Sequence, residues 1–389
     1  MFRCAVKAFF LASVFFVILP SAMADEFDEG LNHYYKKEYL PAIRKLQKFI
    51  EKKPYPETMY LIGYMYEKGD RWNKNKAIRF SPDRNKAFSY FEKAAEKGNA
   101  EAQYYLGKMY YSGLGAGRDL QKSYEWRKKA AESGHMKAQY ELGIMNMHGA
   151  GTVVDNEQAA YWLTRSADQG YAYAKNRLLS LRYIFINDLK DEPYAIYYRG
   201  VFFRKGYGED QNDEQAWKYY SKAAELGNPG AFYDMGLMYY YGRHVKHDNR
   251  EAFNCFLKAA EKGHVMAQKK VGVMYLKGEG VRSSVKDGFK WLSKAAENGN
   301  VYAQRKIGDM LLNGKEIKTD FKAGIKWTEL AAEKGDIYSQ RKIAEIMFSG
   351  RKIKKNLFKA EYWARMAAMK NDKKAVELYE KIRKSLEKQ

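Results

Sequence analysis

Three pairs of basic residues recur at intervals of 36 positions toward the C-terminal end of the sequence. The pairs are Lys269-Lys270, Arg305-Lys306 and Arg341-Lys342. Lysine and arginine side chains bind anionic groups through their charge and their N–H donors. If the interval is that of a stacked structural repeat, the three pairs lie side by side as a ladder of positive charge. The pattern therefore predicts a binding surface for an acidic partner, although side chains of these types also commonly face solvent.

Earlier in the sequence, the residues at the equivalent positions are aromatic or acidic. The corresponding pairs are Tyr104-Tyr105, Tyr140-Glu141, Tyr197-Tyr198 and Tyr233-Asp234. Tyrosine gives a rigid contact area at low entropic cost when it lies on a binding surface. We therefore add Tyr104, Tyr105, Tyr197 and Tyr198 to the six basic residues as candidate partner-binding residues.

The charge of the whole chain is concentrated in the same region. The formal net charge is +22. Residues 265–389 hold 29 Lys/Arg and 15 Asp/Glu, a net charge of +14, whereas residues 25–264 hold 38 and 32, a net charge of +6. An excess of this size favours acidic proteins, anionic lipid headgroups or acidic envelope polymers as partners.

Other patterns with chemical potential are weaker. His244 and His247 lie close together, but neither a cysteine nor a third histidine stands near them in sequence, so no metal site is predicted. Cys255 replaces an aromatic residue of other copies and is predicted to be a small apolar filler. The glycines at 149–151 and 278–280 follow a helix rather than a strand, which indicates loop geometry rather than a phosphate site. No catalytic residue, cofactor or enzymatic activity is predicted.

The positions of these residues are set by an internal repeat. A pair of small residues recurs with steps of 36 residues and a single step of 57. Its members are Ala94-Ala95, Ala130-Ala131, Ser166-Ala167, Ala223-Ala224, Ala259-Ala260, Ala295-Ala296, Ala331-Ala332 and Ala367-Ala368. The longer step indicates an extra or degenerate helix at 173–193, and the first unit has a longer loop, 70–82. Eight copies of one unit thus account for most of the chain.

Each copy has the pattern of two helices, called A and B here. Helix A carries a small residue where a neighbouring helix must cross closely: Gly63, Gly107, Gly143, Gly200, Gly236, Gly272, Gly308 and Ala344. Helix B should begin after a capping side chain: Asp83, Asp119, Asp155, Asn212, Asp248, Ser284, Asp320 or Asn356. It should end before a glycine: Gly98, Gly134, Gly170, Gly227, Gly263, Gly299 or Gly335. No alternating apolar segment competes, so the fold class is all-α, a solenoid of stacked helical hairpins.

At this level of detail the copies resemble a known family. The segment "AEAQYYLGKMYYSGLG", followed by "DLQKSYEWRKKAAESG", resembles the Sel1-like repeat, a relative of the tetratricopeptide repeat. The resemblance implies a right-handed superhelix with a groove lined mainly by the A helices. It also implies scaffold or adaptor roles in protein–protein interaction, often in the bacterial envelope or at a host interface.

The first residues have the composition of a secretory signal peptide. Arg3 and Lys7 precede an apolar stretch, Ala8–Pro20, and Ala22-Met23-Ala24 fits a cleavage site. Cleavage after Ala24 and a periplasmic or secreted location are therefore expected, with an uncleaved anchor as the alternative. No later segment has the eighteen consecutive apolar residues of a membrane span, so the mature chain is expected to have no transmembrane segment.

The expected organisation follows from these patterns. It comprises a signal peptide at 1–24, an N-terminal helical pair at 25–57, repeats one to three at 58–172, the extra helix at 173–193, repeats four to eight at 194–370 and a C-terminal capping helix at 371–389. The function we expect is a non-enzymatic interaction scaffold that binds an acidic protein through the groove. Nucleic acid is disfavoured by the expected export. An immunity-type inhibitor of a toxic envelope-targeting enzyme, or an envelope assembly or motility factor that contacts anionic glycan or lipid, are alternatives.

Overall fold

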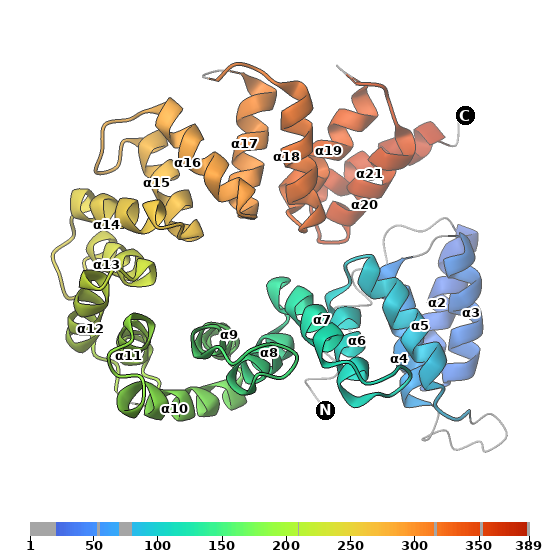
Figure 1. The fold of residues 1–389 in the computed structure, drawn as a ribbon. Helices are drawn as coiled ribbons and strands as arrows, with labels where there is room; N and C mark the ends of the chain where they lie inside the picture. The colour runs from blue at the N-terminus through green and yellow to red at the C-terminus, as the bar shows by residue number, and fades with distance from the viewer. Residues whose placement is uncertain are drawn as a thin grey trace. The chain divides into compact units, whose positions relative to one another are not determined.

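The protein is built from helices throughout the part of the chain that the structure describes. The computed structural model describes residues 21–52, 55–69, 80–208, 210–314, 317–350 and 353–386. These residues form twenty helices and no strand (Figure 1), which confirms the all-α prediction. Within them, no helix is long and apolar enough to cross a membrane. The apolar stretch of the expected signal peptide and most of the longer loop of the first repeat lie outside the described residues.

The chain divides into two compact units at Asp188 and Leu189. The helices of the N-terminal unit are α2 (Ser21–Tyr35), α3 (Tyr39–Lys52), α4 (Pro56–Lys68), α5 (Arg84–Glu96), α6 (Ala100–Ser112), α7 (Leu120–Glu132), α8 (Met136–His148), α9 (Asn156–Asp168) and α10 (Ala172–Asn187). In this unit α4, α6 and α8 are A helices, and α5, α7 and α9 are B helices. The stretch for which the repeat spacing indicates an extra helix is occupied by α10.

The C-terminal unit continues the alternation of A and B helices. Its helices are α11 (Pro193–Lys205), α12 (Asp213–Glu225), α13 (Pro229–Tyr241), α14 (Asn249–Glu261), α15 (Val265–Lys277), α16 (Val285–Glu297), α17 (Val301–Asn313), α18 (Phe321–Glu333), α19 (Ile337–Ser349), α20 (Leu357–Ala368) and α21 (Lys373–Leu386). The A helices carry odd numbers from α11 to α19. Each A helix packs most extensively against the B helix that follows it, and each B helix packs less extensively against the helix after it, as expected for stacked hairpins.

The eight predicted capping residues begin the B helices. Each side chain accepts a hydrogen bond from a backbone N–H two or three residues further on, as Asp119 does from Lys122 and Ser284 does from Asp287. This bond satisfies an N–H that has no partner inside the helix. The seven glycines predicted to end the B helices all have φ between 84° and 90°. Both boundary predictions are confirmed.

The close crossing predicted at the helix A glycine is also present. At Gly272, a Cβ atom would lie 2.7 Å from Leu292 Cγ on the partner B helix and 3.1 Å from the Gly288 carbonyl oxygen. Real Cβ atoms do not approach other atoms so closely, so α15 and α16 pack at a distance that only glycine permits. This close contact of two helices offsets the lower helix propensity of glycine.

In five repeats a buried glutamine links the repeat to the one before it. In five A helices the second residue of the Ala-Gln or Ser-Gln motif donates from Nε2 to the carbonyl oxygen of the last small residue of the preceding B helix, at 3.0–3.3 Å. The five glutamines are Gln103, Gln139, Gln268, Gln304 and Gln340. The same carbonyl oxygen also accepts from the N–H of the glycine that ends the helix, so the glutamine adds a second hydrogen bond at the end of each of these B helices.

Candidate functional site

The three dibasic pairs lie on successive A helices of the C-terminal unit. Lys269-Lys270 is on α15, Arg305-Lys306 on α17 and Arg341-Lys342 on α19, and all six residues are half-buried. Half-burial distinguishes them from ordinary surface lysines and arginines, which are mostly exposed. Part of each of these charged side chains therefore contacts other residues of the protein.

The first residues of the pairs alternate with two tyrosines. Lys269 Nζ lies 5.9 Å from the ring centroid of Tyr302, and the guanidinium carbon of Arg305 lies 5.2 Å from the same ring. Arg305 also lies 5.4 Å from the ring centroid of Tyr338, and Arg341 lies 5.5 Å from the same ring. We call this row, Lys269, Tyr302, Arg305, Tyr338 and Arg341, the cation–tyrosine ladder. Each contact is within the range of cation–π attraction.

Two of the three cations in the ladder also face carboxylates. Arg305 Nε lies 3.8 Å from Asp336 Oδ2. Arg341 Nε lies 3.3 Å from Asp372 Oδ1, and Arg341 Nη1 lies 3.3 Å from Glu345 Oε1. The positive charge of α17 and α19 is thus partly neutralised within the protein.

Asp309 adds a further negative charge between α17 and α19. Its Oδ1 accepts a hydrogen bond from the Tyr338 hydroxyl at 3.2 Å. Burial raises the pKa of Asp309, while Tyr338 and the charges of Lys342, Arg305 and Lys306 oppose that rise. The carboxylate therefore lies within the field of three cations.

Lys269 and Lys270 lack such compensation. Among the described residues, no carboxylate oxygen lies within 4.0 Å of either amine, and Val273 stands where α17 has Asp309. Lys270 Nζ instead lies 4.5 Å from the ring centroid of Tyr240 and 5.9 Å from that of Tyr241. Burial and the charge of Lys270 lower the pKa of Lys269. This pair is the strongest candidate anion site among the three dibasic pairs.

The first position of each pair has a structural role as well. In five repeats its side chain contacts the residue just before the helix that follows the next B helix, 31 positions further on. The contacts are Tyr104 with His135, Tyr140 with Tyr171, Tyr233 with His264, Arg305 with Asp336 and Arg341 with Asp372. The residue types are matched, because tyrosine meets an aromatic ring and arginine meets a carboxylate. This position therefore contributes to the junction between neighbouring repeats.

The four predicted tyrosines are largely packed inside the protein. Tyr104 is 8% exposed and donates from its hydroxyl to Glu141 Oε1 at 2.9 Å, while Tyr198 is 6% exposed. Tyr197 donates to Asp234 Oδ2 at 2.9 Å, and Tyr105 stacks on a neighbouring phenylalanine ring. Their contact with a partner stays a prediction, for which Tyr104 and Tyr198 offer little surface.

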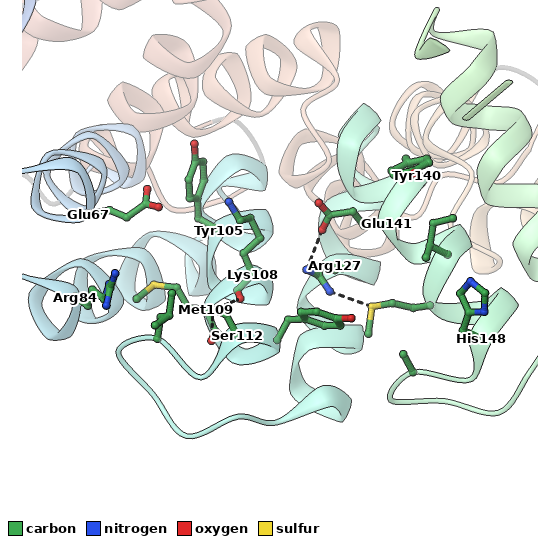
Figure 2. Close-up of a pocket in the computed structure, with 15 residues that line it drawn as sticks. Glu67, Arg84, Tyr105, Lys108, Met109, Ser112, Arg127, Tyr140, Glu141 and His148 are labelled. Carbon is green, nitrogen blue, oxygen red and sulfur yellow. Dashed lines mark hydrogen bonds and ion pairs between the residues drawn. The ribbon is translucent and has the colours of Figure 1, made fainter. Parts of the chain in front are cut away.

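A second polar cluster, in the N-terminal unit, was not predicted. Arg127 on α7 is 4% exposed, and its Nη2 lies 2.9 Å from Glu141 Oε2. Its Nη1 donates to Ser123 Oγ at 2.9 Å and to Met145 Sδ at 3.2 Å. Burial lowers the pKa of Arg127, and the charge of Glu141 opposes this. Figure 2 shows Arg127 between the side chains of α6 and those of α8.

Comparison with known proteins gives the family. Nine segments match the Sel1 repeat, at residues 56–99, 100–135, 137–171, 193–228, 231–264, 265–300, 301–336, 337–372 and 369–382. The chain belongs to the Sel1 repeat family. Sel1 repeats generally mediate protein–protein interaction, and the family is typically a non-catalytic scaffold. No curated protein matches the chain.

Two solved structures illustrate the similarity. A protective antigen of uropathogenic Escherichia coli with the same repeat fold is 27% identical over 86% of this chain and 65% of its own, with a TM-score of 0.44. A Sel1 repeat protein from Oxalobacter formigenes is 26% identical over 84% of this chain and 86% of its own, with a TM-score of 0.46. The chain thus spans about two thirds of the length of the antigen.

Comparison among the Sel1 repeats could have revealed Arg127 from the sequence. At the equivalent position the other B helices mostly carry large apolar residues: Phe91, Leu163, Tyr220, Phe256 and Leu292. All five are buried. A buried charged residue requires a partner, and Glu141 supplies one. The feature of the sequence that indicates this cluster is an arginine at a repeat position where most other copies carry a large apolar residue.

The remaining sequence candidates have ordinary environments. Burial raises the pKa of Cys255 to about 11, which keeps it a thiol at neutral pH. His247 Nδ1 lies 2.8 Å from the Tyr240 carbonyl oxygen. Within the described residues, no group of three His, Cys, Asp or Glu side chains is placed to hold a metal ion.

His264 makes the stability of the Sel1 array sensitive to acid. Its Nδ1 accepts a hydrogen bond from the Ala267 N–H at 3.2 Å and caps α15. Burial lowers its pKa to about 4, below the unfolded value of 6.5. As the pH falls, His264 is therefore protonated in the unfolded state before it is protonated in the folded state. The stability that neutral His264 contributes is fully present above pH 6.5 and is lost as the pH falls toward 4.

We expect His264→Asn to remove this sensitivity, because asparagine caps helices well and does not titrate. At pH 7 the two proteins should have similar free energies of unfolding. At pH 4.5 the variant should be more stable by roughly 2 kcal/mol. Urea unfolding followed by circular dichroism at both pH values measures the difference, and an equal acid loss in both proteins would refute the assignment to His264.

Proposed function

We propose that the protein is a binding scaffold whose C-terminal unit holds an acidic segment of a partner protein at Lys269 and Lys270. The family supports a protein partner. The observation that carries the acidic character is the absence of a carboxylate within 4.0 Å of either amine among the described residues, whereas Arg305 and Arg341 each face one. The two amines are held by aromatic rings and partly desolvated, which strengthens their attraction for an anionic group.

The neighbouring residues favour a chain over a small anion. Arg305, Lys306 and Lys342 extend the positive surface along α17 and α19, where Asp309 and, at Arg305, Asp336 only partly balance their charge. A partner with several carboxylates along an extended or helical segment would meet these charges in succession. The apolar stretch Ala8–Pro20 and the Ala22-Met23-Ala24 site support export, and we propose that the partner is met in the periplasm or outside the cell.

Charge reversal at the proposed site tests this function. Lys269→Glu with Lys270→Glu should weaken binding of a fluorescein-labelled polyglutamate peptide at least ~10-fold at low salt, measured by fluorescence anisotropy. The weakening should shrink as the salt concentration rises, because exposed charges are screened. The same double variant, used as bait, should lose a natural partner that the wild-type protein retains.

A matched control separates the site from net charge. Lys286 and Lys290 are exposed on the B helix α16, so Lys286→Glu with Lys290→Glu changes the total charge by the same amount in the same unit. We expect this variant to bind within about twofold of wild type. If both double variants lose affinity equally, binding depends on overall charge and the proposed site is wrong.

A further inference from the structure

The B helices of the C-terminal unit carry a second charged surface, which the proposed function does not use. Three positions of each repeat, two residues before the capping residue and two and six residues after it, are exposed in all of the last four repeats. The second and third of these positions are four residues apart, so they lie on the same face of the B helix. The twelve residues are Lys246, Arg250 and Asn254; Arg282, Lys286 and Lys290; Lys318, Lys322 and Lys326; and Lys354, Phe358 and Tyr362.

The charge at these positions changes along the chain. In the last four repeats the twelve positions hold nine basic residues and no acidic residue. In the first four repeats they hold one basic residue, Lys218, and four acidic residues, Glu125, Glu157, Asp210 and Glu214. Both sets of repeats have the same helices and the same kind of capping residue, so the fold itself does not require lysine or arginine here.

The nine basic residues form a continuous surface, which we call the B-helix basic row. Equivalent positions of stacked repeats lie side by side, and α14, α16, α18 and α20 belong to one compact unit. Among the described residues, no carboxylate oxygen lies within 4.0 Å of any of the nine side chains. The neighbouring carboxylates of Asp287 and Asp320 are engaged at the starts of their helices, with the Ser284 hydroxyl and the Ala323 N–H. The row therefore presents its charge to solvent without internal compensation.

Two exposed aromatic residues stand at the end of the row. Phe358 is 77% exposed, and Tyr362, one turn further along α20, is 46% exposed. The helix packs against the protein through other residues, such as Leu357 and Ala364, which are buried. At the position of Phe358 the other seven copies all carry a polar or charged residue: Asn85, Gln121, Glu157, Glu214, Arg250, Lys286 and Lys322. Packing within the protein thus does not account for a phenylalanine at this position.

We propose that the B-helix basic row and Phe358 bind the surface of a lipid bilayer that contains anionic lipids. Lysine and arginine side chains are attracted to anionic headgroups, and an aromatic side chain that enters the interfacial layer is removed from water. The charges are spread over four helices, which suits a partner that is itself a surface. A single-stranded nucleic acid would require rings spaced along its path, whereas the two rings of this surface lie together at one end.

Binding to vesicles of defined composition tests the proposal. The protein used begins at Asp25, where the expected cleavage leaves it, because the apolar stretch Ala8–Pro20 would bind lipid by itself. Vesicles of phosphatidylcholine with about 30% phosphatidylglycerol should bind it at least ~10-fold more tightly than vesicles of phosphatidylcholine alone. The difference should shrink as the salt concentration rises. Co-sedimentation measures both affinities, and equal affinities would overturn the proposal.

Two charge-reversed variants separate this surface from the site proposed on α15. Lys286→Glu with Lys290→Glu should weaken binding to the anionic vesicles at least ~10-fold. Lys269→Glu with Lys270→Glu changes the total charge by the same amount and should bind these vesicles within about twofold of wild type. For the polyglutamate peptide the order of the two variants is reversed, so failure of one surface is distinguishable from failure of the other. Equal losses of vesicle binding in both variants would show that only net charge matters and would overturn the proposal.

Phe358 variants test whether the aromatic side chain enters the bilayer. Phe358→Ala should keep the circular dichroism of the wild type and bind the anionic vesicles about 5-fold more weakly. Tyr183→Ala, at an exposed aromatic residue of α10 outside the row, is the control and should bind as the wild type does. In Phe358→Trp, brominated lipids should quench the tryptophan fluorescence more strongly than in the wild type. The proposal is wrong if Phe358→Ala binds vesicles normally, or if it weakens binding of single-stranded poly(dT) instead.

Discussion

Replacing Arg127 by leucine destabilises the N-terminal unit by roughly 3–5 kcal/mol, although leucine is the residue of two other repeats at this position. The substitution leaves the Glu141 carboxylate half-buried, with the Tyr104 hydroxyl as its remaining close partner. An unpaired charge in such a place is strongly unfavourable. Urea unfolding followed by circular dichroism measures the loss.

Adding Glu141→Tyr to Arg127→Leu should recover that loss or give a protein more stable than the wild type. An apolar pair of similar volume often replaces a buried ion pair without cost. The two substitutions are therefore strongly non-additive, with a coupling energy of about 3 kcal/mol. Arg165→Leu, at an exposed arginine of α9, serves as the control and should change stability by less than about 0.5 kcal/mol. If Arg127→Leu left the free energy of unfolding unchanged, the Glu141 carboxylate would not require the arginine as a partner.

Gly280→Ala is expected to cost at least about 3 kcal/mol. Gly280 lies in the loop after α15 with φ of 68°, a conformation that is unfavourable for other residues. Its Cβ would lie 2.0 Å from the Asn249 carbonyl oxygen and 2.9 Å from the Arg250 nitrogen. Both are backbone atoms at the start of α14, so the loop can accept a methyl group only if two repeats move apart.

Gly278→Ala is the matched control, two residues away in the same loop. Its φ is 72°, so it bears similar backbone strain, but the nearest atom to its Cβ would be Ser283 Cβ at 3.4 Å. We expect a cost of about 1 kcal/mol from strain alone. Urea unfolding of both variants measures the difference. If Gly280→Ala lowers the free energy of unfolding no more than Gly278→Ala does, the loop does not pack closely against α14.

The fold could be predicted because its determinants are local. Asp119 and Ser284 start helices through bonds to residues three positions away, and Gly134 and Gly299 end them through their own φ. Such features repeat at a fixed interval, so each copy supports the assignment of the others. The close approach at Gly272 was visible for the same reason.

The environment of the candidate residues could not be predicted in the same way. The Arg305 charge is partly neutralised by Asp336, which limits its availability to a partner. Lys269 has no such neighbour, because Val273 occupies the position equivalent to Asp309. Arg127 and Glu141 are fourteen positions apart, on different helices. These contacts depend on the stacking of side chains between helices, which single-residue patterns do not encode.

The matched contacts between the first residue of each pair and the next capping residue have a consequence for the gain and loss of repeats. Each contact joins an A helix to the residue just before the helix that follows the next B helix, as Arg305 joins Asp336 and Arg341 joins Asp372. If a duplication or deletion begins and ends between a capping residue and its helix, both residues of every matched contact stay together. If it begins and ends at the start of a B helix, the two residues that meet at the new junction come from different repeats and are not matched. Family matches at 265–300, 301–336 and 337–372 follow the first boundary. Recombination at that boundary changes the length of the array without requiring compensatory substitutions at the new junction.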